Sequence, residues 1–241
     1  MAKKLYTPGQ AQPFALSRSK VELHVDCPRC FYLDRRLGIA RPPGFPFNLN
    51  SAVDALLKKE FDLCRARGEP HPYMQEAGVR AVPHPHPQLD TWRANFTGIR
   101  TRHAASGFEL FGAIDDLWRD LETGELIVVD YKATSKDAEV TLDADWQDGY
   151  RRQMAFYQWL LRANGYTVAR RGWFVYCNGR RDLDRFDKRL EFRVTLIPHE
   201  ADDSWIEPEL LAIRKTLDAD TPPAPTLGCE YCEFAAKAAR A

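Results

Sequence analysis

Three charged residues, Asp115, Asp130 and Lys132, are those in this chain whose types and spacing best suit chemistry. Asp130 and Lys132 lie two apart directly after the apolar run 126–129, and residues two apart on a strand face the same side. A turn at residues 123–124 predicts a hairpin that brings Asp115, on the preceding strand, beside them. The spacing therefore predicts two carboxylates and a lysine in one small site.

Two neighbouring carboxylates are suitable ligands for Mg²⁺ or Mn²⁺, and the backbone carbonyl of Tyr131 is a further candidate ligand. A metal held by Asp115 and Asp130 would polarise a scissile phosphate and lower the pKa of a bound water. Lys132 would orient that water and offset the developing negative charge. The competing interpretation is an exposed salt bridge on a hairpin, which is common. The wholly apolar run before Asp130 favours a specific site instead.

A polar–aromatic pair, Gln153 and Tyr157, stands on the helix that we expect over residues 145–164. The two residues are four apart and share one helix face. We expect Gln153 to point towards the lysine and the attacking water, and Tyr157 to lie near a DNA backbone. A solvated glutamine and a half-buried tyrosine are the plainer alternative.

The remaining elements must position these side chains. Strand-like runs occupy residues 98–104, 109–119, 125–133, 172–177 and 190–197, with helices expected from Ser17, from a cap at Asn50 or Ser51, and over residues 203–217. The run 126–129 is apolar without alternation, which is typical of a central strand buried on both faces. This order of elements predicts a mixed α/β sheet.

The motifs Gly112-x-Ile-Asp115, Asp130-Tyr-Lys132 and Gln153-x-x-x-Tyr157, in this order, resemble the PD-(D/E)XK nucleases of the RecB type. The resemblance implies a restriction-endonuclease-like mixed sheet flanked by helices. It also implies a Mg²⁺- or Mn²⁺-dependent deoxyribonuclease, an exonuclease rather than a sequence-specific endonuclease. A catalytically silent DNA-binding assembly subunit with the same fold is the alternative.

A length of 241 residues suits one compact domain, and we expect a single nuclease domain over residues 1–241, with the resemblance covering its central half. The expected parts are a helical segment over residues 17–66, a catalytic core over 95–200 and a cysteine-containing segment over 221–241. Relatives often place a metal-ligand histidine on an early helix, and Asp54 stands at that position here. Asp54 is therefore a candidate third acidic ligand, or a residue on the solvated face of its helix.

Two C-x-x-C pairs stand near opposite ends of the chain: Cys27 with Cys30, and Cys229 with Cys232. If the fold brings them together, four thiolates would suit Zn²⁺ or a [4Fe–4S] cluster. Buried free thiols are the competing interpretation. Some RecB-like exonucleases, including the one used in CRISPR spacer acquisition, join their termini with such a cluster, so the resemblance favours [4Fe–4S] over zinc. Those relatives use one N-terminal and three C-terminal cysteines, and this chain departs from that pattern.

Composition limits the other classes of function. Lys+Arg and Asp+Glu are both 34, so the net charge is zero, which argues against a protein that coats polyanions. No apolar leader and no run of about 20 apolar residues is visible, so we expect a cytoplasmic protein without a membrane partner. The expected partner is single-stranded or end-containing DNA, with protein partners in DNA repair or CRISPR-type processing implied by the resemblance.

Further residues are candidates for contacts with that DNA. Arg151 and Arg152 are expected to contact phosphates, and Trp146 is an aromatic residue that can stack on an unpaired base. Cys64 and Cys177 stand alone in the sequence, and we expect both in the core.

Overall fold

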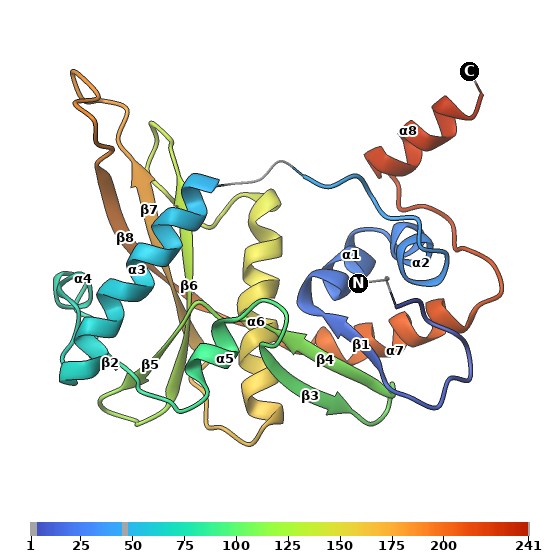
Figure 1. Ribbon diagram of the computed structural model, residues 1–241, viewed down its shortest axis with the longest axis horizontal. Helices are drawn as coiled ribbons and strands as arrows, with labels where there is room; N and C mark the ends of the chain where they lie inside the picture. Colours follow the sequence, from blue (N-terminus) through green and yellow to red (C-terminus); the bar gives the residue numbers. More distant parts are fainter. Residues whose placement is uncertain (1–3, 45–47, 241) are drawn as a thin grey trace. The chain divides into compact units, whose positions relative to one another are not determined.

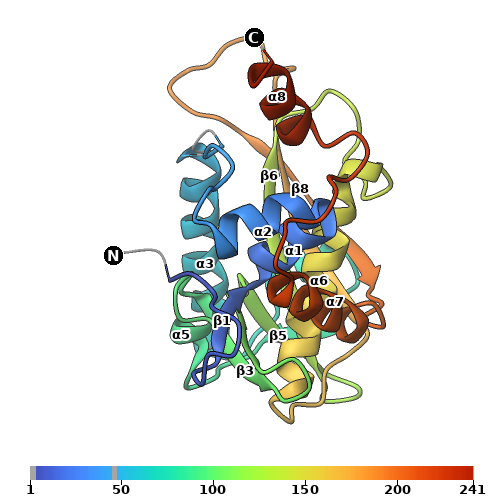
Figure 2. The same ribbon diagram turned by 90° about the vertical axis from the view of Figure 1, so that its right-hand side faces the viewer.

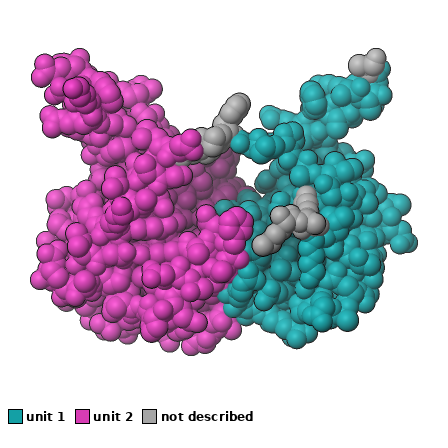
Figure 3. Space-filling model, viewed as in Figure 1, with its two compact units in different colours: residues 1–45, 100–111, 204–241 teal, residues 46–99, 112–203 magenta. Residues whose placement is uncertain are grey.

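A computed structural model describes residues 4–44 and 48–240. Within them the chain forms two compact units, shown in different colours in Figure 3. The terminal unit comprises residues 4–44, 100–111 and 204–240, and the central unit comprises residues 48–99 and 112–203. The assignment of one nuclease domain to the whole chain stays a prediction.

The central unit contains a five-stranded mixed sheet (Figure 1). Its elements are α3 (Asn48–Arg67), α4 (Pro72–Glu76), β2 (Ala81–Pro83), α5 (Leu89–Arg93), β5 (Asp116–Asp120), β6 (Leu126–Thr134), the 3-10 helix η1 (Asp145–Gln147), α6 (Asp148–Ala163), β7 (Arg171–Gly179) and β8 (Phe192–Glu200). The strand order is β2-β5-β6-β7-β8, with β6 and β7 parallel and the other neighbours antiparallel. The mixed sheet and the buried central strand are thereby confirmed.

The two faces of β6 carry different side chains because successive residues of a strand point to opposite sides. Val129 and Tyr131 pack with Leu57 and Phe61 of α3 in the hydrophobic core of this unit. Asp130, between them, points to the other face, where α6 lies. Figure 1 shows β6 between α3 and α6. Both faces of the strand are thus buried, and the face with Leu126 and Val128 continues into Asp130 and Lys132.

The terminal unit combines helices with a small sheet of order β1-β4-β3. Its elements are β1 (Phe14–Ser17), α1 (Arg18–Asp26), α2 (Pro28–Arg36), β3 (Ile99–His103), β4 (Phe108–Gly112), α7 (Ile206–Asp218) and α8 (Glu230–Ala238), β3 and β4 extending by one residue each into the central unit. Strands β1 and β4 are parallel. Helices α1, α2 and α7 pack together, as Figure 2 shows, with the apolar face of α7 (Ile206, Leu210, Ile213 and Leu217) buried. No helix in residues 4–44 or 48–240 is long and apolar enough to cross a membrane.

Two expectations about local structure are wrong. The single strand predicted over residues 109–119 is two strands, β4 and β5, in different sheets, because the chain is irregular at 113–115, where Ile114 N–H donates to the Trp92 carbonyl. Helix α3 begins at Asn48, so Asn50 and Ser51 lie within its first turn. The Asn50 side chain donates to the Ala133 carbonyl (3.0 Å) instead of capping the helix.

Candidate active site

Asp130 and Lys132 lie side by side on the face of β6 that packs towards α6, as their spacing predicts. The Asp130 side chain is fully buried, and its Oδ2 forms an ion pair with Lys132 Nζ. Its Oδ1 accepts a hydrogen bond from Gln153 Nε2 of α6 (2.9 Å). A lysine on one side and an amide on the other therefore fix the orientation of the carboxylate.

Asp115 lies in the irregular segment directly before β5, not within a strand. Its Oδ2 accepts a hydrogen bond from the N–H of Tyr131 (2.8 Å). This bond holds the Asp115 carboxylate against β6 at the residue that separates Asp130 from Lys132. Lys58 Nζ of α3 lies 3.7 Å from its Oδ1. Burial, followed by the nearby Asp130 carboxylate, raises the pKa of Asp115 to about 7, although Lys132 and Lys58 oppose this shift. The two carboxylates are therefore close enough to repel each other.

These residues fit a divalent cation. Asp130 Oδ2 is buried and, apart from its ion pair with Lys132, accepts no hydrogen bond from the described part of the chain. A cation near Asp115 and Asp130 would offset their mutual repulsion, and both offer the carboxylate oxygens that Mg²⁺ and Mn²⁺ prefer.

Gln153 and Tyr157 of α6 hold the Asp130 side chain through a short chain of hydrogen bonds. Gln153 Nε2 lies 3.1 Å from the Tyr157 hydroxyl as well as bonding Asp130. Tyr157 is buried, and its ring lies against Gly112, where an added Cβ would come within 2.6 Å of ring atom Cε1. The glycine of the Gly112-x-Ile-Asp motif thus makes room for the tyrosine. The expected position of Tyr157 near DNA stays a prediction.

Asp54 is paired within its own helix. Lys58 Nζ lies 2.8 Å from Asp54 Oδ2, so one lysine contacts both Asp54 and Asp115. The ligand roles of Asp54 and of the Tyr131 carbonyl stay predictions. Lys58 is a residue that the sequence reasoning did not single out, although it stands four residues after Asp54, at the spacing of a helical ion pair.

A buried charged network beneath Asp115 was also missed. Asp116 is fully buried, and Arg65 and Arg93 both bind its Oδ1. The Tyr131 hydroxyl donates to its Oδ2 (2.8 Å). Arg93 Nε donates in addition to the Asp115 carbonyl (3.0 Å), which fixes the irregular segment. The adjacent acids Asp115 and Asp116 were the available signal in the sequence. Neighbouring residues of an extended chain point to opposite sides, so only one of the two can face the site and the other needs partners of its own.

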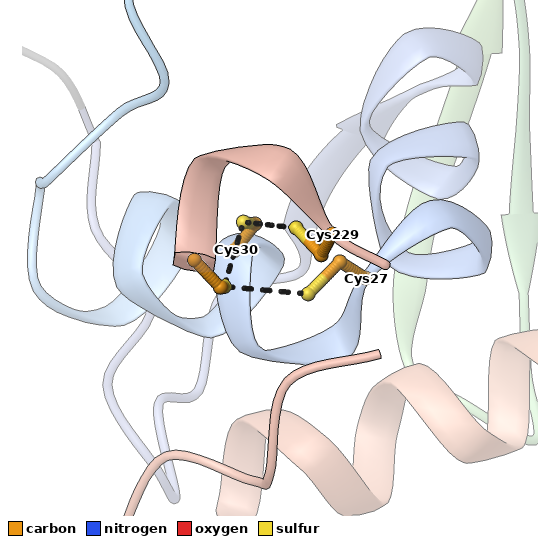
Figure 4. A group of neighbouring side chains, drawn as sticks. Cys27, Cys30 and Cys229 are labelled. Carbon is orange, nitrogen blue, oxygen red and sulfur yellow. Dashed lines mark hydrogen bonds between the residues drawn. The ribbon is translucent and has the colours of Figure 1, made fainter. Parts of the chain in front are cut away.

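The four cysteines of the two C-x-x-C pairs meet in the terminal unit, where Figure 4 labels Cys27, Cys30 and Cys229. Their sulfur atoms all lie within 4.8 Å of one another, with Cys27–Cys232 at 3.8 Å, Cys30–Cys229 at 3.6 Å and Cys30–Cys232 at 3.5 Å. They are the one group of three or more potential His, Cys, Asp or Glu ligands this tight in residues 4–44 and 48–240. The four cysteines could bind a metal.

The local structure favours a thiolate at Cys27, whereas burial raises the pKa of Cys30 and of Cys232. Cys27 and Cys229 are the N-cap residues of α2 and α8, where helix dipoles favour negative charge. Burial opposes ionisation of Cys27, but hydrogen bonds, the largest from the backbone of Cys30 and of Thr226, lower its pKa to about 6. Arg41 Nη2 lies 3.7 Å from Cys229 Sγ and adds positive charge. Cys64 and Cys177 are buried elsewhere, as expected of core residues.

Comparison with known proteins identifies the family. The family model described as PD-(D/E)XK nuclease superfamily matches residues 15–236. No curated protein matches the chain. A solved structure described as "Crystal structure of SSO0001" is similar over 94% of this chain and 86% of its own, with 16% identity and a TM-score of 0.45. The family-model match spans most of the sequence and includes all the site residues described above. This chain therefore belongs to the PD-(D/E)XK nuclease superfamily.

Proposed function

We propose that this chain is a Mg²⁺- or Mn²⁺-dependent deoxyribonuclease of the RecB type, acting as an exonuclease on single-stranded or end-containing DNA. The observation that carries the proposal is the buried Asp130 carboxylate held between Lys132 and Gln153, with Asp115 bonded to the same strand. Membership of the superfamily supports nuclease chemistry. The RecB type, the exonuclease activity and partners in DNA repair or CRISPR-type processing rest on the resemblance of the motifs.

The residues would divide the reaction between them. Asp115 and Asp130 would hold the divalent cation, which supplies Lewis acidity and a water of lowered pKa when bound. Lys132 Nζ, which lies beside Asp130, would orient the water and offset charge on the phosphoryl oxygens. Gln153 would hold Asp130 in place, and Tyr157 would hold Gln153.

The test is digestion of end-labelled single- and double-stranded DNA by the purified protein. We expect cleavage with Mg²⁺ or Mn²⁺, none with EDTA, and recovery when excess Mg²⁺ is restored. Lys132→Met should lower the rate at least about 100-fold, as loss of a charge-stabilising donor does. Lys59→Met, at an exposed position on α3, is the matched control. Full activity of Lys132→Met would contradict the proposal, and DNA binding without cleavage under any divalent metal would favour the silent assembly subunit.

For the four cysteines we propose a resident metal that joins segments from the two ends of the chain. Four thiolates around one tetrahedral ion with Zn–S bonds of about 2.3 Å lie about 3.8 Å apart, close to the spacing here. A [4Fe–4S] cluster binds each cysteine to a separate iron and holds the sulfurs farther apart. The spacing therefore favours Zn²⁺, whereas the resemblance favours the cluster. None of the six cysteines forms a disulfide in the structure, and we propose a reducing, cytoplasmic compartment.

Metal analysis of anaerobically purified protein separates the two occupants. A colourless protein with one zinc per chain supports the single ion. A brown protein that contains iron and acid-labile sulfide supports the cluster. Absence of both metals would contradict a metal role for the four cysteines.

A further inference from the structure

Trp146 is an exposed aromatic side chain close to the candidate active site. It lies on η1, immediately before α6, and 59% of its surface is accessible. Its ring meets Tyr150 edge-on, with centroids 5.6 Å apart. Tyr150 in turn lies under Lys132, whose Nζ is 4.5 Å from the ring centroid. One aromatic ring therefore connects Trp146 to the candidate catalytic lysine.

The segment that carries Trp146 is fixed in place. Val140 and Leu142 are buried, and so is Gln147, the residue next to the tryptophan. Gln147 Nε2 donates to the Thr141 carbonyl (2.6 Å), and Arg151 Nη1 binds the Leu142 carbonyl. The outward position of Trp146 thus belongs to a turn that is anchored by buried Val140, Leu142 and Gln147.

A cation accompanies the exposed ring. Lys136 Nζ lies 5.0 Å from the centroid of Trp146. The backbone of Lys136 is held by Asn178 of β7, which accepts from its N–H (2.8 Å) and donates to its carbonyl (3.0 Å). Single exposed aromatics are common on protein surfaces and need no explanation by themselves. An exposed tryptophan on an anchored turn, beside a lysine whose backbone is held in place, is a combination suited to stacking a base and binding the adjoining phosphate.

We propose that Trp146 is a stacking platform for an unpaired base of a DNA strand whose scissile phosphate lies at Asp130 and Lys132. The steps of 5.6 Å to Tyr150 and 4.5 Å to Lys132 Nζ span at most about three stacked nucleotides at about 3.4 Å each. A base within a duplex is stacked on both faces and cannot use the platform. The platform therefore selects single-stranded or frayed ends, a specificity that rests on the proposed nuclease function.

The test is equilibrium binding of fluorescent oligothymidylate, and of an abasic strand of equal length and charge, in buffer without divalent metal. Trp146→Ala should weaken oligothymidylate binding about 5- to 150-fold, the range for loss of one stacked base. Trp146→Phe, which keeps a ring, should retain most of the affinity while abolishing the quenching of Trp146 emission. Phe186→Ala, at another exposed aromatic residue, is the control that should change the binding of neither strand. Binding of the abasic strand should be the same in all variants.

The platform would be overturned by a loss of less than twofold in Trp146→Ala, or by an equal loss for the abasic strand. Failure of the parent protein to bind oligothymidylate would overturn it as well. The platform would also be overturned if Trp146→Ala changed the sedimentation mass of the protein without changing its affinity for DNA, because Trp146 would then contact protein. Cleavage is scored separately with Mg²⁺, so a protein that binds through Trp146 without cutting refutes the nuclease proposal alone.

Discussion

The central unit and the terminal unit each hold a group of residues suited to a metal, and the two groups differ in almost every respect. The central site offers carboxylate oxygens from Asp115 and Asp130, with a lysine beside them. The terminal site offers four sulfur atoms within 4.8 Å of one another. Oxygen ligands suit hard cations that keep waters, whereas four thiolates complete a tetrahedron and leave no open position. We therefore propose a catalytic role for the first site and a structural role for the second.

The two sites also differ in how the chain builds them. Asp130 and Lys132 come from one strand at the centre of a sheet, so local geometry places them together. Cys27 and Cys232 are separated by 205 positions and meet through the packing of the terminal unit. Closing so long a loop costs chain entropy, which a bound metal would offset. The following four predictions test whether catalysis and stability separate in this way.

The largest effect is expected from the cysteines. Replacing Cys27 and Cys229 together by serine should remove the metal and destabilise the terminal unit by on the order of 10 kcal/mol, since metal binding supplies folding free energy at such sites. Metal content and thermal unfolding measure this loss. Cys64→Ala, which removes a lone buried thiol, should cost only about 1 kcal/mol. If the double variant were as stable as the parent, a structural role for the four-cysteine site would be contradicted.

Asp115→Asn should have the opposite effect, a large loss of cleavage rate without a loss of stability. Loss of one carboxylate ligand should lower the cleavage rate about 1000-fold, equivalent to about 4 kcal/mol. Because Asp115 and Asp130 repel each other, the metal-free variant should be at least as stable as the parent. Single-turnover cleavage and thermal unfolding give the two numbers. An Asp115→Asn variant that is less stable than the parent but keeps the same cleavage rate would contradict this prediction.

Arg93→Met tests the network beneath the central site. It removes a cation that binds Asp116 and the donor to the Asp115 carbonyl, leaving Arg65 to pair with a buried carboxylate. Breaking a buried pair of this kind costs about 3–5 kcal/mol, reduced here by the remaining arginine to about 2–3. Denaturant unfolding measures the loss. Arg93→Lys should recover stability more than cleavage, because lysine cannot replace both hydrogen bonds; equal recovery of both would exclude a positioning role.

Asp54→Asn should have the smallest effect. Asp54 pairs with Lys58 on the surface of α3, and such pairs contribute about 0–1 kcal/mol to stability. We expect a rate reduction below about tenfold, caused by Lys58 moving towards Asp115. A reduction comparable to that of Asp115→Asn would instead make Asp54 a metal ligand, and the Mg²⁺ dependence of the rate would distinguish the two.

The sequence by itself determined what short periodicities control. Alternation along a strand placed Asp130 beside Lys132, and helical spacing placed Gln153 and Tyr157 on one face. The apolar run 126–129 identified the central strand, and the two C-x-x-C pairs identified the candidate ligands of the terminal unit. These patterns repeat over two to four residues, so they can be read without knowing the fold.

The tertiary structure alone decided how distant segments meet. It moved Asp115 out of the predicted strand into a break between two sheets, where the Tyr131 N–H reaches it. It also buried Asp116 between Arg65 and Arg93, and set Tyr157 against Gly112. Each of these contacts joins residues far apart in the chain. No local periodicity encodes such contacts, because they depend on how the sheet and helices pack.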